Sequence, residues 1–176
     1  MKRIALCLGV LMLASCSMFH TGDAAPTPGC PATGLVKGAG FYPLIAGGDA
    51  HSASGDLVAF ARVQGIEGGC KFGKDGITAN LTINFAGHRG PKGDNLGSQK
   101  FPYFIAVLSP DGQILQRQAF STTVSFDNGA GGGASSEEHR ILVPLKDLSL
   151  SPSYQIAAGF ALTPRQAQYN KENHAD

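Results

Sequence analysis

A strict alternation of apolar and polar residues over residues 77–85 constrains the fold more than any other feature of this sequence. Isoleucine, alanine, leucine and phenylalanine occupy every second position, and threonine and asparagine fill the positions between them. A period of two places the two sets on opposite faces of an extended strand, one toward a core and one toward water. Strands with one wet face are typical of antiparallel sheets. The segment therefore predicts a half-buried strand of an antiparallel sheet.

Residues 101–126 predict a long β-hairpin at the middle of such a sheet. Residues 103–108 are apolar at nearly every position, which is typical of a central strand buried on both faces. A turn follows at Pro110, Asp111 and Gly112, whose fixed φ, side-chain acceptor and tolerance of positive φ suit a tight turn. After the turn, four residues alternate onto one face of the second strand: Phe120, Thr122, Val124 and Phe126.

The rest of the chain adds short strands separated by turn-rich segments. An irregular edge strand is expected within residues 34–45, where Pro43 cannot donate a ladder hydrogen bond. Further strands are expected at residues 56–64, 137–145 and 154–162, with turn-rich or loop segments at residues 65–76, 87–100 and 127–136. The last of these loops is glycine-rich and is expected to be flexible. Thr163 as N-cap and Pro164 at the first helical position predict a short C-terminal helix.

About seven strands without a helix-sized amphipathic segment before the C-terminus predict an all-β fold. We expect an antiparallel β-sandwich, immunoglobulin-like in the broad sense, with a short C-terminal helix. A small β-barrel is the alternative. The sequence has no tryptophan, so the buried tryptophan of true immunoglobulin domains is missing.

The N-terminus has the layout of an export signal. Lys2 and Arg3 precede an apolar segment at residues 4–14, which is too short to span a bilayer as a mature helix. The segment ends in Leu-Ala-Ser-Cys at residues 13–16, which resembles the lipobox of bacterial lipoproteins. The resemblance implies a signal peptide at residues 1–15, cleavage before Cys16, and lipidation of Cys16 on its sulfur and its new amino group. An ordinary secretory signal that contains a cysteine is the alternative.

A lipidated Cys16 implies firm membrane attachment, because several acyl chains anchor a protein stably whereas one holds it only marginally. Residues 16–29 are then the lipidated cysteine and a flexible tether, with an end-to-end distance of roughly 20 Å. Residues 30–176 are expected to form one domain. Ser17 follows the cysteine where an aspartate is found in lipoproteins of the inner membrane. The resemblance therefore implies the outer membrane of the cell envelope, with the domain facing the periplasm.

Four cysteines are present, and two remain once the signal and the anchor are assigned. Cys7 is lost with the signal, and Cys16 is lipidated. Cys30 and Cys70 form an even pair in an oxidising compartment, which predicts a disulfide bond. Neither has a second cysteine or a histidine at the spacing of metal ligands.

Charge and motifs argue against nucleic-acid binding and known catalytic sets. Loss of residues 1–15 removes two of the 14 basic residues, which leaves 12 against 13 acidic residues and a formal net charge of −1. Such a balance gives no electrostatic basis for binding nucleic acid. The sequence has no nucleophile elbow, zinc-protease motif, P-loop or dinucleotide fingerprint. We predict no catalytic residue, no cofactor and no enzymatic activity.

Two groups of side chains are candidate sites. The first is a metal site that needs distant loops to meet: His51, His88, Glu137, Glu138 and His139. Nothing in the spacing requires such a site, and surface histidines are commoner, so no metal site is predicted. The second is an exposed aromatic patch, for which packing in the core and at an edge is the favoured alternative: Phe41, Tyr42, Phe101 and Tyr103.

From Cys30 onward the chain resembles a group of uncharacterised small lipoproteins of Gram-negative bacteria. The features that carry the resemblance are Cys30, Asp-Leu at 56–57, Gly-Gly-Cys at 68–70, Phe-Pro-Tyr-Phe-Ile-Ala-Val at 101–107, Pro-Asp-Gly at 110–112, Gly-Phe-Ala-Leu-Thr-Pro at 159–164 and Tyr-Asn at 169–170. The resemblance implies location and fold and brings no known activity.

The expected function follows from the anchor and the fold. We expect a lipid-anchored envelope protein that is a non-catalytic protein–protein interaction or structural module with an unidentified envelope protein partner. The alternative is a binding module for a small ligand or an envelope polymer. A hydrolase with a dispersed site is the third and least favoured hypothesis.

Overall fold

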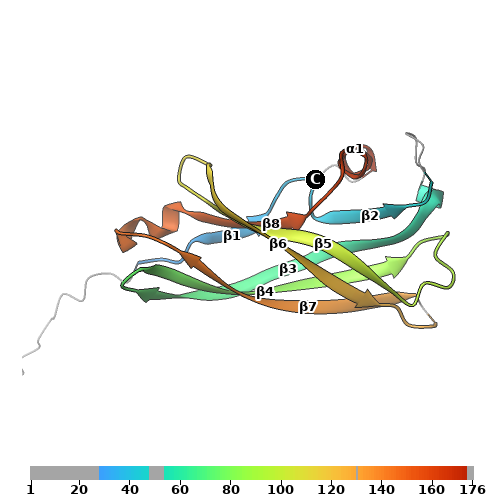
Figure 1. The fold of residues 1–176 in the computed structure, drawn as a ribbon, viewed down its shortest axis with the longest axis horizontal. Helices are drawn as coiled ribbons and strands as arrows, with labels where there is room; N and C mark the ends of the chain where they lie inside the picture. Colours follow the sequence, from blue (N-terminus) through green and yellow to red (C-terminus); the bar gives the residue numbers. More distant parts are fainter. Residues whose placement is uncertain (1–27, 48–53, 130, 174–176) are drawn as a thin grey trace, which may run out of the picture.

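The computed structural model describes residues 28–47, 54–129 and 131–173, which form two packed β-sheets (Figure 1). Sheet A has the strand order β1-β8-β5-β6, and sheet B has the order β2-β3-β4-β7. All pairs are antiparallel except β1 and β8, which run parallel. The predicted β-sandwich is confirmed. The two sheets stay separate over the described ranges, so the alternative of a small barrel is wrong.

Sheet A consists of β1 (Ala32–Leu35), β5 (Ser98–Leu108), β6 (Ile114–Ser125) and β8 (Gln155–Phe160). Sheet B consists of β2 (Phe41–Ile45), β3 (Leu57–Gly73), β4 (Gly76–Arg89) and β7 (Gly132–Val143). Two short 3₁₀ segments, η1 (Ser54–Asp56) and η2 (Leu148–Ser153), and the helix α1 (Pro164–Asn173) complete the described fold.

The core lies between the sheets and is filled from both sides by alternating residues. Strand β4 buries its apolar set as its alternation predicts: Ile77, Ala79, Leu81, Ile83 and Phe85. Strand β5 of the facing sheet buries an equally apolar set: Phe101, Tyr103, Ile105 and Val107. Phe85 and Tyr103 bring the two sets together, with ring centroids 4.9 Å apart.

The predicted hairpin of residues 101–126 forms, but its second strand lies elsewhere in the sheet than expected. Strand β5 is central, between β8 and β6, as its unbroken apolar run predicts. Strand β6 is the edge of sheet A and has no strand on its other side within the described residues. The first half of β6 is accordingly exposed, whereas Thr122 and Val124 in its second half are fully buried.

Two segments expected to be turns or loops are strands. Strand β3 continues through residues 65–73, and β7 begins at Gly132 rather than after residue 136. Pairing with a neighbour overrides the low strand propensity of glycine in both places. A Cβ on Gly68 would lie 2.3 Å from the carbonyl oxygen of Asn80, and one on Gly133 would lie 1.9 Å from that of Ser125. These glycines therefore permit close backbone approach.

The single edge strand expected within residues 34–45 is two strands in different sheets. The chain leaves β1 in sheet A, turns through residues 36–40 and enters β2 in sheet B. The amide of Val36 donates to Ala158, and the amide of Phe160 donates to Ala39, so β8 holds the crossing segment. Pro43 lies in β2, an edge strand, as predicted.

Helix α1 packs against the edge strand β2 of sheet B. Thr163 caps the helix as predicted: the backbone amide of Gln166 donates to its Oγ1 over 3.3 Å, and the Thr163 amide donates to Oε1 of Gln166 over 2.8 Å. Tyr169 stacks on Phe41, with centroids 6.4 Å apart. The Nδ2 of Asn170 donates to the carbonyl oxygens of Gly38 and Phe41.

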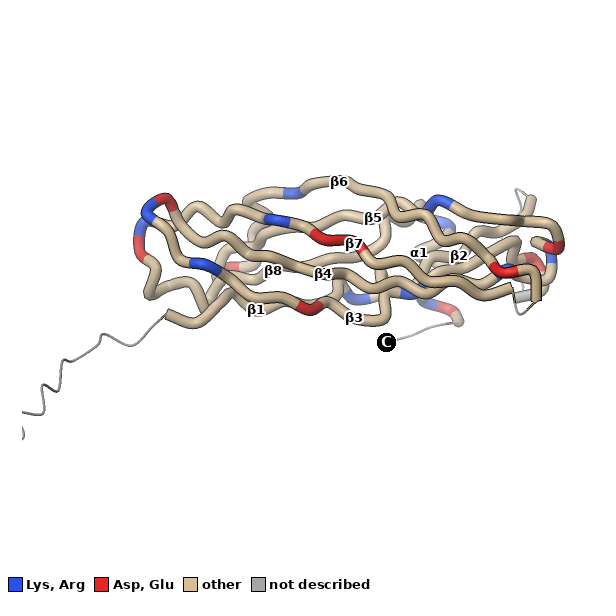
Figure 2. The backbone as a smooth tube through the Cα atoms, turned by 90° about the horizontal axis from the view of Figure 1, so that it is seen from below, with Lys and Arg blue, Asp and Glu red and all other residues tan. Residues whose placement is uncertain are grey.

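The sandwich is elongated and has two distinct ends (Figure 1). We call the end where the described chain begins the tether end; it also holds the β3–β4 turn and η2. The opposite loop end holds η1 and the connections β4–β5 and β6–β7. Basic and acidic residues are interspersed at both ends (Figure 2).

Candidate functional surfaces

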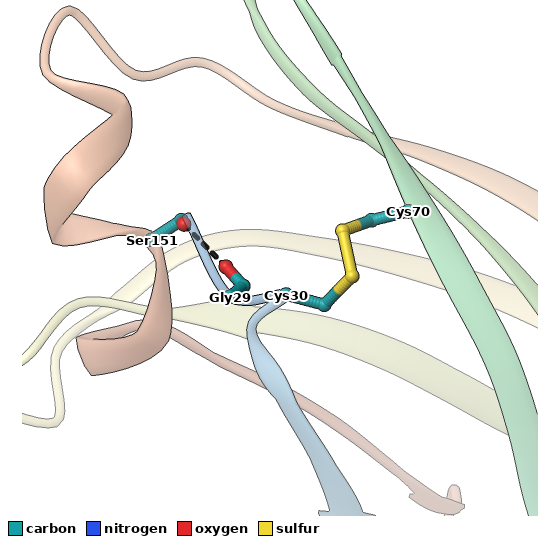
Figure 3. Close-up of a disulfide and its surroundings, with 4 residues drawn as sticks. All are labelled: Gly29, Cys30, Cys70 and Ser151. Carbon is teal, nitrogen blue, oxygen red and sulfur yellow. Dashed lines mark hydrogen bonds between the residues drawn. A yellow bond between two sulfur atoms is a disulfide. The ribbon is translucent and has the colours of Figure 1, made fainter. Parts of the chain in front are cut away.

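The predicted disulfide is present at the tether end. Cys30, just before β1, is bonded to Cys70 of β3, with the two Cα atoms 5.8 Å apart. Beside it, the Ser151 hydroxyl of η2 donates to the carbonyl oxygen of Gly29 (Figure 3). The disulfide and this hydrogen bond fix the point at which the N-terminal segment meets the sandwich.

The predicted lipidation residue, Cys16, lies outside the described residues, as do the predicted signal peptide and most of the predicted tether. The ranges that the structure does describe contain no helix long and apolar enough to cross a membrane.

The candidate metal ligands that the structure describes do not come together at one site. His51 lies outside the described residues. His88 pairs with Gly132 and His139 pairs with Leu81, so the two histidines are separated by seven positions along β4, or about 23 Å. His88 stacks on Phe60 with centroids 5.5 Å apart. Among the described residues no three histidine, cysteine, aspartate or glutamate side chains gather at a possible metal site.

The hypothetical aromatic patch is not exposed, and the packing alternative is confirmed. Phe101 and Tyr103 are fully buried between the sheets. Tyr42 packs edge-on against Phe101, with centroids 5.5 Å apart. Phe41 points to the opposite side of β2 and is buried under α1.

A hydrogen-bonded cluster that the sequence analysis did not predict lies where β6 and β7 meet. We call it the β6–β7 seam; its members come from three strands: Tyr103, Phe120, Thr122, Ser135, Glu137 and His139. The Tyr103 hydroxyl and Nε2 of His139 share a 2.6 Å hydrogen bond. Phe120 lies against the His139 ring, with centroids 4.3 Å apart.

The fully buried Thr122 is the centre of the other half of the seam. Its hydroxyl donates to Oε1 of Glu137 over 2.8 Å, and it lies 2.7 Å from the Ser135 hydroxyl. A hydroxyl has one proton, so Thr122 must accept the proton of Ser135. The only sequence signal for this cluster was a threonine in the inward row of β6, between phenylalanine and valine.

Burial sets the electrostatics of the seam. Desolvation raises the pKa of Tyr103 well above its ordinary value, and the nearby Glu137 carboxylate raises it further. Desolvation also lowers the pKa of His139, against the opposing attraction of Glu137. Both Tyr103 and His139 are therefore neutral near pH 7. Their hydrogen bond joins β5 of sheet A to β7 of sheet B at the edge of the core.

The loop end is held by backbone hydrogen bonds. The amides of Gly90 and Lys92 donate to Val58 and Leu57, and the amide of Phe126 donates to Gly97. In the loop after β6, Asp127 accepts from the amide of Gly131 over 2.9 Å. These hydrogen bonds connect the described loops to the strands, and residues 132–136 of the expected glycine-rich loop belong to β7.

An open groove lies on the side of the sandwich where the chain crosses between sheets. It has a volume of about 620 Å³, and its lining includes Leu35, Lys37, Phe41 and Arg62. The Arg62 guanidinium lies 4.9 Å from the centroid of the Phe41 ring. A neighbouring hollow of about 360 Å³ shares Arg62 and adds Arg89. Both are open surface depressions whose charged side chains are basic.

No family model and no curated protein matches the chain. The resemblance to small Gram-negative lipoproteins therefore stays a prediction.

Proposed function

We propose that this chain is a lipid-anchored protein of the bacterial cell envelope, attached through Cys16, that serves as a non-catalytic protein–protein interaction or structural module. The observation that carries the proposal is the lipobox-like sequence at residues 13–16, behind a basic start and a short apolar segment. The Cys30–Cys70 disulfide supports it, because such bonds persist in oxidising compartments. Ser17 favours the outer membrane, with the domain in the periplasm.

The orientation of the domain relative to the proposed anchor supports a role in protein–protein contact. An anchor ahead of Gly29 holds the tether end near the lipid and directs the loop end away from it. Loops carried on a rigid scaffold are common recognition surfaces. Backbone hydrogen bonds hold the described parts of the β4–β5 and β6–β7 connections, which reduces the conformational entropy that they would lose when a partner binds.

The ionisable cluster of the structure supports a non-catalytic role. Tyr103, Glu137 and His139 are bonded to neighbours within the seam and fill the edge of the core. Their arrangement is explained by closure of the sandwich, and no substrate need be invoked for it.

Site-specific crosslinking in membranes tests the proposal. A photo-crosslinking residue at Asn95, exposed at the loop end, should capture the same envelope protein in repeated preparations. A matched probe at Lys71, exposed on β3 toward the tether end, should not capture it. A Cys16→Ser variant should lose both the membrane fraction and the crosslink. Recovery of the chain alone from both probes would refute the contact role.

The groove at Arg62 favours a second candidate, a binding module for an acidic envelope polymer. Its volume lies in the range of ligand sites, and its charged lining is basic beside an aromatic ring. Co-sedimentation with purified peptidoglycan is the test. Binding should fall in Arg62→Gln and stay unchanged in Arg140→Gln, which alters an exposed arginine of β7 outside the groove. Equal binding by both variants would reject this candidate.

A further inference from the structure

Exposed apolar side chains are concentrated at the tether end. Five large apolar residues of the described chain are exposed: Leu35, Ile114, Leu115, Leu142 and Leu150, each by 46% or more. All but Leu35 lie at the end where the described chain begins. We call these four residues the apolar rim. Scattered exposed leucines are ordinary on protein surfaces, but a group at one end indicates contact with something apolar.

The strand register places Ile114 at the same end of sheet A as the start of β1. Across sheet A, Ala32 pairs with Gln155, Gln155 pairs with Leu108, and Leu108 pairs with Ile114. Neighbouring strands are about 4.8 Å apart, so this row crosses roughly 15 Å from β1 to β6. The chain enters only two residues before Ala32, at Cys30.

The 3₁₀ segment η2 joins the rim to the entry point directly. The Ser151 hydroxyl donates a hydrogen bond to the carbonyl oxygen of Gly29. The residue directly before Ser151 is the exposed Leu150. In sheet B, Leu142 pairs with Thr78, two positions from the β3–β4 turn. Leu150 is therefore adjacent to the residue that holds the chain entry, and the other rim residues lie at the same end of the sandwich.

We propose that the apolar rim rests in the headgroup region of a phospholipid bilayer, so that the folded domain is docked on the membrane by its tether end. This inference rests on the proposed function, because the anchor at Cys16 is what brings this end to the lipid. Residues 17–29 span at most about 45 Å when fully extended, so an anchor at Cys16 limits the distance between the rim and the lipid surface to that length.

The anchor makes even weak apolar contacts sufficient. A short link to the membrane gives the rim an effective concentration at the surface on the order of millimolar, and leucine and isoleucine side chains can then insert at the interface. Charge does not oppose this docking or require acidic lipids. Lys74 and Asp75 in the β3–β4 turn, and Lys146 and Asp147 before η2, are exposed as neighbouring pairs of opposite sign. Zwitterionic phosphatidylcholine is therefore a suitable probe.

The absence of tryptophan from the sequence makes the test direct. The full lipidated chain is purified from membranes as Leu150→Trp and reconstituted into phosphatidylcholine vesicles whose acyl chains carry bromine near the headgroup. Bromine quenches tryptophan only on contact. We expect at least twofold quenching for Leu150→Trp and for Ile114→Trp, a second exposed rim position. Asn95→Trp at the loop end is the matched control and should keep its emission.

The outcomes separate the docking from the anchoring. The chain could float with the vesicles while tryptophan at positions 150 and 114 is quenched no more than tryptophan at position 95. That result would overturn the docking and leave the anchor intact. Tryptophan that is shielded from iodide in water but insensitive to brominated lipid means that protein covers the rim, which also overturns it. A wild-type chain found outside the membrane fraction overturns both the anchor and the docking.

Discussion

The two long sides of this sandwich, where edge strands of the two sheets meet, are closed by different means. On the side of β1 and β2, the main chain itself crosses between the sheets, and the Cys30–Cys70 disulfide and helix α1 reinforce it. On the side of β6 and β7, the β6–β7 connection crosses at the loop end, and side-chain hydrogen bonds of the seam around Thr122 and Tyr103 join the sheets along the strands. The first side should respond to reductant and the second to acid, because their bonds differ in kind.

The difference shows how an incomplete edge can be compensated. Strand β2 pairs with β3 only over residues 57–62, so the rest of β3 has no strand beside it on that side within the described fold. The disulfide attaches to this uncovered part at Cys70. Strands β6 and β7 are both long and approach each other, so inward side chains there are close enough to hydrogen bond across the gap.

The largest expected effect is loss of the disulfide. Replacing Cys30 and Cys70 by alanine frees a loop with a sequence separation of 40 residues. The free energy of unfolding should fall by about 4 kcal/mol, because the open loop raises the entropy of the unfolded chain. Urea unfolding of a chain expressed without residues 1–16 measures this loss. Reduction of the unsubstituted chain should reproduce it, and a change below about 1 kcal/mol would contradict the structural role of the bond.

The next effect should come from the opposite seam. Thr122→Val keeps the volume of a buried side chain but removes the bonds to Glu137 and Ser135. We expect a loss of about 1–3 kcal/mol in unfolding free energy, because two polar groups lose their buried partner. Thr123→Val, one position along β6 on the exposed face, is the control and should change stability little. The effect of Thr122→Val should persist in reductant; equal stability of the two variants would argue against the seam.

A smaller and more local effect is expected at α1. Asn170→Ala removes hydrogen bonds of 2.8 and 2.7 Å to the carbonyl oxygens of Gly38 and Phe41. The cost should be about 1–2 kcal/mol, with faster amide hydrogen exchange in α1 and β2 than in the core strands. The exposed Gln168 provides the control as Gln168→Ala. Uniform exchange changes over both sheets would show that the helix is not a separate element of the crossing side.

The smallest effect is a dependence of stability on mild acid. The pKa of His139 is lowered in the fold by burial, so the unfolded chain binds its proton first as the pH falls. Stability should be complete above the ordinary histidine pKa and decrease as the pH drops from there to the folded pKa. Unfolding measured across this range in the original chain and in His139→Gln tests it. The decrease should be smaller in the variant; identical profiles would remove His139 as its source.

The strand pattern and the start of the helix were predictable from local residues. The alternation in β4, the unbroken apolar run of β5 and the cap at Thr163 all depend on periodicity or nearest neighbours, which are visible in the chain. The glycine-rich parts of β3 and β7 were predicted as turn or loop, because local residues do not indicate their strand conformation. Their strand conformation depends on a partner backbone far away in sequence, and propensity does not report that partner.

The β6–β7 seam could not be predicted from the sequence. Tyr103, Thr122 and His139 are distant in sequence, and each alone looks like an ordinary strand residue. Only the register of β5 with β6 and the packing of β6 against β7 brings them within hydrogen-bond distance. The apolar rim is similar, because its leucines and isoleucine come from β6, β7 and η2 and reach the same end of the sandwich only in the folded protein.

The sequence by itself determined that the chain makes half-buried antiparallel strands and that a short capped helix follows the last strand, and it predicted the Cys30–Cys70 disulfide that the structure contains. These properties depend on periodicity, residue count and local hydrogen bonding. The tertiary structure decided which strands share a sheet, which edges are exposed, and which polar groups meet across the gap. Those outcomes depend on contacts between segments that are far apart in the chain. Such contacts form only when the strands of the whole sandwich pair and pack together.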